Sequence, residues 1–227
     1  MMKFSSEMLT GKCRDHLQPL PCPFSMNHFL QADALKAFRA LQKSAVENSF
    51  DLQPASSFRD FQRQQLIWNA KFIGERKVHD DQGMALNLTA LSDWEKAQAI
   101  LRWSAMPGAS RHHWGTEVDI FDPGLLPHGQ SLQLEPWEYT QGGYFYELSQ
   151  WLQENLCRFD FTLPFVNLTK NKQIGCEPWH ISYLPIAELA REQFTPEVLL
   201  SAWENEDVMG KNTLTRHLPE IFQRFWL

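Results

Sequence analysis

Apolar side chains recur every three or four positions in several stretches of the chain, and this spacing predicts helices that each bury one face. In the first stretch, Leu35, Phe38 and Leu41 share a face. Another stretch opens with Ser92 and Glu95, which form a capping-box pattern typical of a helix start. We therefore expect helices over residues 33–48, 60–73, 92–104 and 144–156, with Asp33 as the cap of the first.

Other segments are short, apolar and bounded by turn residues, which is typical of strands. Thr116 to Phe121 is followed by the turn sequence Asp122-Pro123-Gly124, for example. Thr195 precedes a proline at a first helical position, so the C-terminal tail is expected to be helical. The expected segments are strands over 116–121, 159–165 and about 179–183, an extended stretch over 50–58, and a helix over 218–225.

These elements predict an α+β fold, in which helices flank a small antiparallel sheet and a helical elaboration follows at the C-terminus. Residues 1–27 carry three closely spaced prolines and little periodicity, so we expect an irregular arm lying on the surface. We expect residues 28–185 to form the main domain. Residues 186–227 are expected to be a helical extension packed on that domain.

Composition narrows the function classes. The 227 residues are 43% hydrophobic and 21% charged, which is ordinary for a globular protein. The formal net charge is −6, so binding to nucleic acid, which depends on neutralising phosphates, is not expected. No apolar run approaches the ~20 residues of a membrane helix. The chain begins without a signal-peptide pattern, so we expect a cytoplasmic protein, or a periplasmic or exported one if a longer precursor precedes Met1.

The four cysteines show no CxxC pair, so a zinc knuckle built from thiolates is not expected. The spacing of Cys13 and Cys22 allows a disulfide, whereas a cytoplasmic protein is expected to keep free, buried thiols.

Two segments hold the candidate chemistry of the chain, one over residues 110–119 and one over residues 177–183. They supply His112, Asp119 and His180, which are ligand types that Zn²⁺ accepts at a catalytic site with one place left for water. Glu177, three positions before the second histidine, fits a general base that moves the proton of that water. The neighbouring His113 is not expected to be a ligand, because adjacent residues in an extended segment point to opposite faces.

The pattern S-x-H-x-x-G-x-x-x-D, followed by E-P-W-H-x-x-Y, resembles the zinc D-Ala-D-Ala carboxypeptidases of the VanY type. Their wider group includes D-Ala-D-Ala dipeptidases, L,D-carboxypeptidases of peptidoglycan and the hedgehog signalling domain. A third motif of this family, S-G-[YF]-R-S-x-x-x-Q, is similar to the stretch from Ser56 to Gln64. The resemblance covers about residues 28–185.

This resemblance implies that His112, Asp119 and His180 hold one zinc ion, with Glu177 as the catalytic base. It implies that Arg59 meets the negative charge of the substrate. Two further residues, Gln64 and Ser110, are implied as its helpers in substrate binding.

The implied activity is release of the C-terminal D-Ala from peptidoglycan stem peptides or muropeptides. The alternatives are an L,D-carboxypeptidase of muropeptide recycling and a catalytically silent, zinc-bound interaction domain. A hydrolase built on Cys176 and His180 is a further alternative, although no orienting residue or oxyanion signature accompanies it.

Two positions depart from the family pattern. Ser57 stands where the first motif has glycine, and Glu117 stands where the family usually has a small residue. Glu117 either orients an imidazole from outside the metal site or faces solvent.

Overall fold

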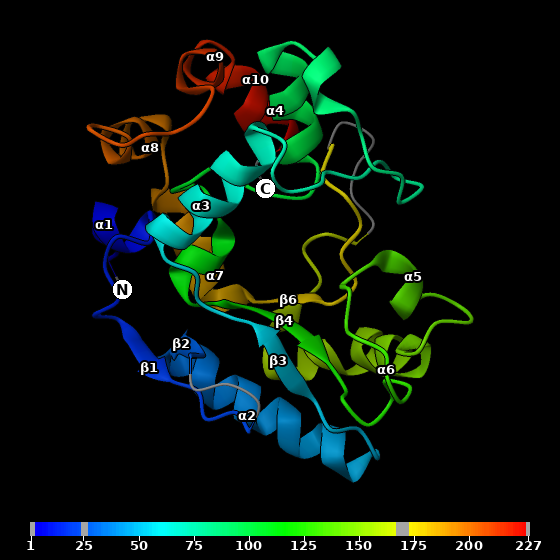
Figure 1. Ribbon diagram of the computed structural model, residues 1–227. Coiled ribbons are helices and arrows are strands. Elements are labelled where there is room, and N and C mark those ends of the chain that lie inside the picture. Colours follow the sequence, from blue (N-terminus) through cyan, green and yellow to red (C-terminus); the bar gives the residue numbers. More distant parts are fainter. Residues whose placement is uncertain (1–2, 24–26, 167–172, 226–227) are drawn as a thin grey trace.

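The computed structural model describes residues 3–23, 27–166 and 173–225, and a four-stranded antiparallel sheet lies at its centre. In spatial order its strands are β3 (Gln53–Ser56), β4 (Glu117–Phe121), β6 (His180–Tyr183) and β5 (Phe161–Thr162). Helices lie on both sides of the sheet (Figure 1). The predicted fold class, a small antiparallel sheet flanked by helices, is confirmed.

The four long helices predicted from periodicity are all present. They are α2 (Ala32–Glu47), α3 (Phe61–Phe72), α4 (Asp93–Leu101) and α6 (Tyr146–Asn155). The capping box of Ser92 and Glu95 is confirmed at the start of α4. The cap of α2 was assigned wrongly, because the side chain of Gln31, not that of Asp33, accepts the first backbone N–H groups of the helix.

The other helices include α7 (Leu184–Gln193), which is as long as α6, and several shorter ones. The shorter ones are α1 (Ser6–Leu9), α5 (Pro136–Tyr139), α8 (Pro196–Ala202), α9 (Lys211–Arg216) and α10 (Leu218–Arg224), with 3-10 turns η1 (Leu88–Ala90), η2 (Arg111–Trp114) and η3 (Leu156–Phe159).

Two apolar clusters form the core. One contains Val118, Ile120 and Ile181 from the sheet together with the buried faces of α2 and α6. The other joins α3 and α4 to the C-terminal helices, and the indole of Trp203 donates to the carbonyl of Pro107 at 2.7 Å. In Figure 1, α2 lies below the sheet, whereas α3, α4, α9 and α10 lie above it. The apolar face of β4 is therefore covered, and its other face is available for polar chemistry.

The expectation that residues 1–27 form an irregular surface arm is wrong for the described part. Residues Leu17–Pro19 form β1, which pairs antiparallel with β2 (Phe29–Gln31). The side chains of Phe4 and Leu9 are buried in one core cluster, and that of Leu20 is buried in the other. Prolines interrupt the sequence pattern here, so these short elements carry no periodic signal.

The strand predicted over 159–165 shrinks to β5, which has only two residues. The start of the predicted strand instead belongs to η3, whose C-terminal cap, Asp160, has a left-handed conformation with φ 59°. Pro164 follows, and proline has no N–H to donate to a strand ladder. The apolar character of 159–165 thus reflects packing at a turn.

All four cysteines are free, so no disulfide joins Cys13 to Cys22. Cys22 is buried, but Cys157 and Cys176 are exposed, which corrects the expectation of buried thiols. None of the described helices combines the length and the apolar character that crossing a membrane demands.

Candidate metal and catalytic site

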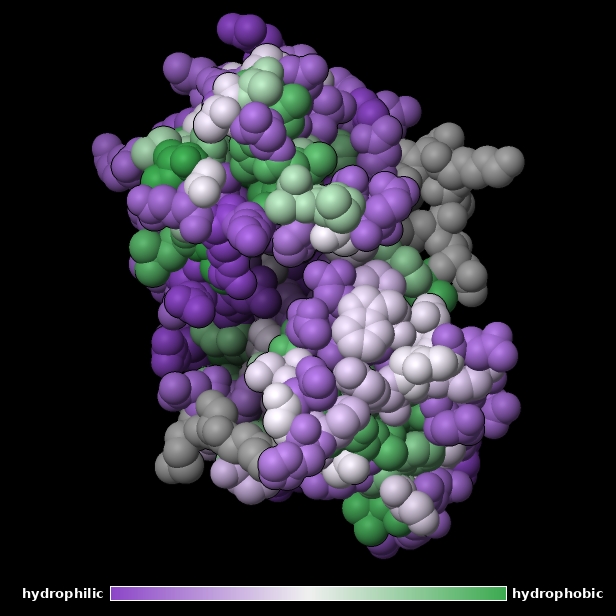
Figure 2. Space-filling view, turned by 45° about the vertical axis from the view of Figure 1, so that its right-hand side comes forward, coloured by the Kyte–Doolittle hydropathy of each residue, from purple (hydrophilic) through white to green (hydrophobic). Residues whose placement is uncertain are grey.

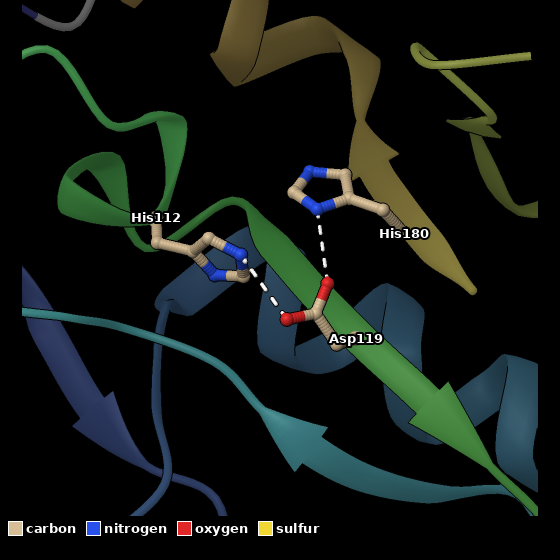
Figure 3. A group of neighbouring side chains, drawn as sticks. All are labelled: His112, Asp119 and His180. Atoms are coloured by element: carbon tan, nitrogen blue, oxygen red, sulfur yellow. Dashed lines mark hydrogen bonds and ion pairs between the residues drawn. The ribbon is translucent and has the colours of Figure 1, made fainter. Parts of the chain in front are cut away.

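The register of the central sheet brings two of the predicted ligands together. Asp119 on β4 is paired directly with His180 on β6, and side chains at directly opposed positions of antiparallel strands share one face. His112 comes from η2, just before β4. Its Nε2 lies 3.3 Å from Asp119 Oδ2, while His180 Nδ1 lies 3.0 Å from Asp119 Oδ1 (Figure 3). One ligand atom from each of the three buried residues lies within 4.8 Å of the others.

The second nitrogen of each imidazole has a partner outside this group. His112 Nδ1 donates to the carbonyl of Ser57 at 2.7 Å, which leaves the Nε2 lone pair facing Asp119. His180 Nε2 lies 2.7 Å from Glu117 Oε2, which leaves Nδ1 directed at Asp119. Such outer partners fix the tautomer and the ring orientation of a metal ligand. Two imidazoles and one carboxylate, so oriented, fit a single zinc ion with a fourth position open.

Glu117 faces the site because residues at i and i+2 of a strand lie on the same face. It is paired with Ser182 on β6, and its Oε1 accepts hydrogen bonds from the hydroxyls of Ser182 and Thr116 at 2.7 Å and 2.9 Å. Its side chain is fully buried, so the alternative in which Glu117 faces solvent is wrong.

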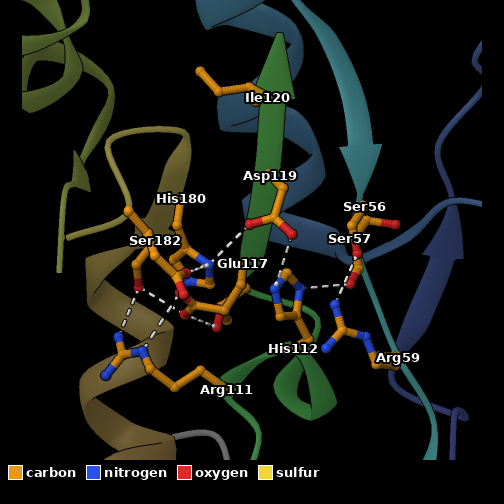
Figure 4. A network of polar contacts seen from close by, with 12 residues as sticks. Ser56, Ser57, Arg59, Arg111, His112, Glu117, Asp119, Ile120, His180 and Ser182 are labelled. Atoms are coloured by element: carbon orange, nitrogen blue, oxygen red, sulfur yellow. Dashed lines mark hydrogen bonds and ion pairs between the residues drawn. The ribbon is translucent and has the colours of Figure 1, made fainter. Parts of the chain in front are cut away.

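Arg111 balances the charge of this buried carboxylate. Its Nε lies 3.4 Å from Glu117 Oε2, and its Nη2 donates to Ser182 Oγ at 2.9 Å (Figure 4). Burial opposes ionisation of Glu117, but Arg111 and the bonds from His180 and Ser182 outweigh it and lower the pKa of the carboxyl. The sequence analysis did not predict a role for Arg111 or Ser182. The alternation of side chains along a strand did indicate that Glu117 lies on the same face as Asp119.

We expect Glu117→Gln to weaken zinc binding about 10- to 100-fold, the usual cost of losing an outer partner of a ligating histidine. The amide keeps the shape of the side chain but loses the charge that favours the imidazole N–H, and it leaves Arg111 without its counter-charge. Competition of the protein with a chelator for zinc measures this change.

The matched control is Glu47→Gln, which removes one carboxylate from an exposed position at the end of α2. It should leave the zinc affinity unchanged. If Glu117→Gln binds zinc as tightly as this control, Glu117 does not support His180.

Glu177 lies beside the same cluster, in the turn before β6. Its Oε2 is 3.7 Å from His180 Nδ1, and its side chain is 15% exposed. Burial, reinforced by Asp119, raises the pKa of Glu177 to about 7, and His180 and Arg59 offset only part of the shift. A carboxyl group with a pKa near neutrality can take up and return a proton in the same cycle.

Arg59 is held at the entrance to α3 by neutral acceptors. Its Nη1 donates to Gln64 Oε1 at 2.8 Å and its Nη2 to Ser56 Oγ at 3.3 Å. No carboxylate of the described chain forms an ion pair with this guanidinium. Gln64 is fully buried and donates to the carbonyl of Ala105 at 2.7 Å. Gln64 therefore lies behind Arg59 and is not among the residues that line the cavity.

His113 stays outside the metal group, as expected, but for a different reason. It lies in the 3-10 turn η2, not in an extended segment, and its ring turns toward Arg59. Its Nδ1 donates to the Arg59 carbonyl at 2.6 Å and its Nε2 accepts from the Gly108 N–H at 3.1 Å. Burial lowers the pKa of His113 to about 3, so the ring is neutral near pH 7.

The predicted groups open onto one cavity of about 430 Å³. A hollow with strongly hydrophilic residues is visible between the upper and lower parts of the molecule in Figure 2. The predicted site residues that line this cavity are Arg59, Ser110, His112, Asp119, Glu177 and His180. Ser110 is buried in the wall, and its side chain makes no hydrogen bond within the described chain.

The arrangement of Cys176 argues against a thiol hydrolase. Although Cys176 is exposed at the surface, the neighbouring chain desolvates part of its thiol, and this together with Glu177 raises the pKa of the thiol, whereas a nucleophilic cysteine needs a lowered pKa. Both nitrogens of His180 are directed at carboxylates, so neither is free to activate a thiol.

The chain is similar to several known proteins. An uncharacterised protein of Haemophilus influenzae is 66% identical over 117 residues, which cover 52% of this chain and 89% of that protein. A D-alanyl-D-alanine carboxypeptidase of Enterococcus faecalis is 30% identical over 133 residues, which cover 58% of this chain and 40% of that longer protein.

Among solved structures, a mutant of the vancomycin resistance D,D-pentapeptidase VanY in complex with Zn(II) shares the fold. It has a TM-score of 0.53 at 22% identity, over 87% of this chain and 88% of that one. The family model described as VanY, D-alanyl-D-alanine carboxypeptidase, matches residues 27–186. The chain therefore belongs to the VanY family of D-Ala-D-Ala carboxypeptidases.

Proposed function

We propose that the protein is a zinc-dependent carboxypeptidase that releases the C-terminal D-Ala from peptidoglycan stem peptides. The observation that carries this proposal is the presence of Glu177 and Arg59 on the same cavity wall as the His/Asp/His group. A metal-dependent carboxypeptidase needs a metal site, a base and a cation for the free C-terminus, and this cavity offers all three kinds of group.

In this proposal His112, Asp119 and His180 hold the zinc ion. When bound, zinc lowers the pKa of a water molecule and polarises the scissile carbonyl. Glu177 accepts the proton of the attacking water at its carboxylate and later gives it to the departing amine. The pKa of about 7 suits both transfers, because the group is neither a strong acid nor a strong base near neutral pH.

Arg59 binds the negative charge of the substrate. A guanidinium presents a planar fork of N–H donors that matches a carboxylate with two parallel bonds. Gln64 and Ser56 occupy one donor on each terminal nitrogen and keep the fork in place. The remaining donors are directed to the substrate in this proposal.

Two relatives lend support to the substrate class. The Enterococcus faecalis relative is named a D-alanyl-D-alanine carboxypeptidase, and the VanY structure is that of a D,D-pentapeptidase with Zn(II). A silent zinc-bound domain accounts less well for the site, because it has no need of both Glu177 and Arg59. An L,D-carboxypeptidase of muropeptide recycling uses the same groups and differs in the stereochemistry of the bond that it cuts.

The deciding experiment is mass spectrometry of products from defined pentapeptide and tetrapeptide stems, before and after removal of metal with a chelator. We expect loss of one D-Ala from the pentapeptide, abolition by the chelator, and recovery when zinc is added back. Cleavage of the tetrapeptide alone would assign the L,D activity. Absence of cleavage in the zinc-loaded protein would contradict the enzymatic proposal and leave the silent domain.

A further inference from the structure

The cavity carries more positive charge than the proposed reaction uses. Six lysine and arginine side chains and three aspartate and glutamate side chains line it, although the whole chain has a formal net charge of −6. The six cations are Arg59, Lys71, Arg76, Lys77, Arg102 and Arg111. A cavity of opposite sign to the rest of the chain attracts and concentrates anionic substrates.

Three of these cations already have a partner or a proposed role. Arg111 pairs with Glu117, Arg102 pairs with Asp81, and Arg59 is the proposed partner of the C-terminal carboxylate. The other three, Lys71, Arg76 and Lys77, form no ion pair with any carboxylate of the described residues. They lie together at the end of α3 and in the turn that follows it, so the unmatched charge is confined to one wall.

Lys71 is the innermost of this set. It lies in the last turn of α3 and is partly buried, whereas Arg76 and Lys77 are exposed. Its Nζ donates to Ser104 Oγ at 2.6 Å, which uses one of the three donors of the ammonium group. The bond to Ser104 holds the amine against the cavity wall and leaves two donors for a ligand.

The charge of Lys71 acts directly on the catalytic groups. Burial lowers the pKa of Lys71 to about 8, with Arg76 and Arg59 adding repulsion and Glu177 opposing the shift. Lys71, Arg59 and Glu177 line the same cavity, so their charges influence one another. An anion bound at this wall would relieve the repulsion between Lys71, Arg76 and Arg59 and raise the pKa of the amine again.

We propose that Lys71 and Arg76 form a second anion subsite, which binds a carboxylate on the acyl side of the cleaved bond. This inference rests on the proposed function. Only one residue of the substrate lies beyond the cleaved bond, and its carboxylate is assigned to Arg59. A further carboxylate held in the cavity must therefore belong to the part of the peptide that stays with the acyl group.

The test compares two stem pentapeptides that end in D-Ala-D-Ala. One has its upstream carboxylates free, and the other has the same groups as primary amides. Calorimetry in the zinc-loaded Glu177→Gln background measures their binding without turnover. We expect the free-acid peptide to bind about tenfold more tightly, the size of effect of one charge-assisted hydrogen bond. Lys71→Met should remove most of that difference.

Two further variants complete the test, one as a control and one in the proposed subsite. Lys36→Met removes an exposed lysine on α2, outside the cavity, and should preserve the preference for the free acid. Arg76→Gln changes an exposed residue at the other half of the proposed subsite, and it should reduce the preference in the same direction as Lys71→Met.

The outcomes separate this inference from the proposed function. Equal binding of the two peptides, or an equal loss for both in Lys71→Met, would overturn the second subsite. If Lys71 instead acts only on Glu177, then Lys71→Met with an intact Glu177 lowers kcat for both peptides without raising KM for the free acid, which also overturns it. Failure of the unmutated protein to cut either peptide would contradict the carboxypeptidase, whereas the binding comparison would still decide the subsite.

Discussion

Glu177→Gln should keep the fold and the zinc content of the protein and lose about 10²- to 10⁴-fold in kcat, the usual contribution of a positioned general base. Glutamine has nearly the shape of glutamate but does not accept a proton at neutral pH. Its side chain occupies the same position beside His180, so the ligand atoms have no reason to move. Steady-state kinetics on a D-Ala-D-Ala pentapeptide, together with metal analysis, measures the two properties separately.

Glu135→Gln is the matched control, because Glu135 also lines the cavity but is paired with His79 and takes no part in the proposed chemistry. It should turn over substrate at close to the rate of the unmutated protein. Near-normal turnover in Glu177→Gln would move the base elsewhere, and Glu117 is then the first residue to test.

Arg59→Ala should cost about 2–4 kcal/mol of transition-state stabilisation on stem peptides while zinc binding is retained. The loss is expected because a charge-assisted bidentate pair is roughly twice as strong as a neutral hydrogen bond. Arg59→Lys should recover little of it, since a point charge does not reproduce the planar fork. Values of kcat/KM for the two variants and for an Arg63→Ala control measure the effect. Arg63 is exposed on the first turn of α3, so its removal should change little.

The substrate gives an independent test of the same contact. A pentapeptide whose C-terminus is amidated lacks the charge that Arg59 is proposed to bind, so it should not be cleaved by the unmutated protein. Equal cleavage of the amidated and free-acid peptides would replace the carboxypeptidase with an endopeptidase that uses the same zinc ligands and base.

The sequence was most informative where one periodic pattern decides the structure. The apolar spacing in α2 and α3 and the capping box of α4 each predict a helix without help from the rest of the chain. Short elements such as β1 and α1 have too few residues for a period to develop. Their burial depends on distant partners, as in the hydrogen bond from the Trp114 indole to the carbonyl of Leu9.

The residues of the site also fall into these two groups, those with a local sequence pattern and those whose place depends on distant parts of the chain. His112, Asp119 and His180 stand in recognisable motifs, and the structure brings them together. The outer residues were harder to find, because Arg111 and Ser182 gain their meaning only from the register of β4 against β6. Lys71 belongs to no motif and reaches the cavity because α3 runs along its wall.

Three hydrogen bonds join the segment that carries Arg59 to the turn that carries the first metal ligand. His112 Nδ1 donates to the Ser57 carbonyl, the Arg59 N–H donates to the His112 carbonyl, and His113 Nδ1 donates to the Arg59 carbonyl. Neither segment can shift without breaking contacts of the other. We therefore expect occupancy of the metal position and binding of the substrate carboxylate to be thermodynamically linked, so that each ligand changes the affinity for the other by the same factor.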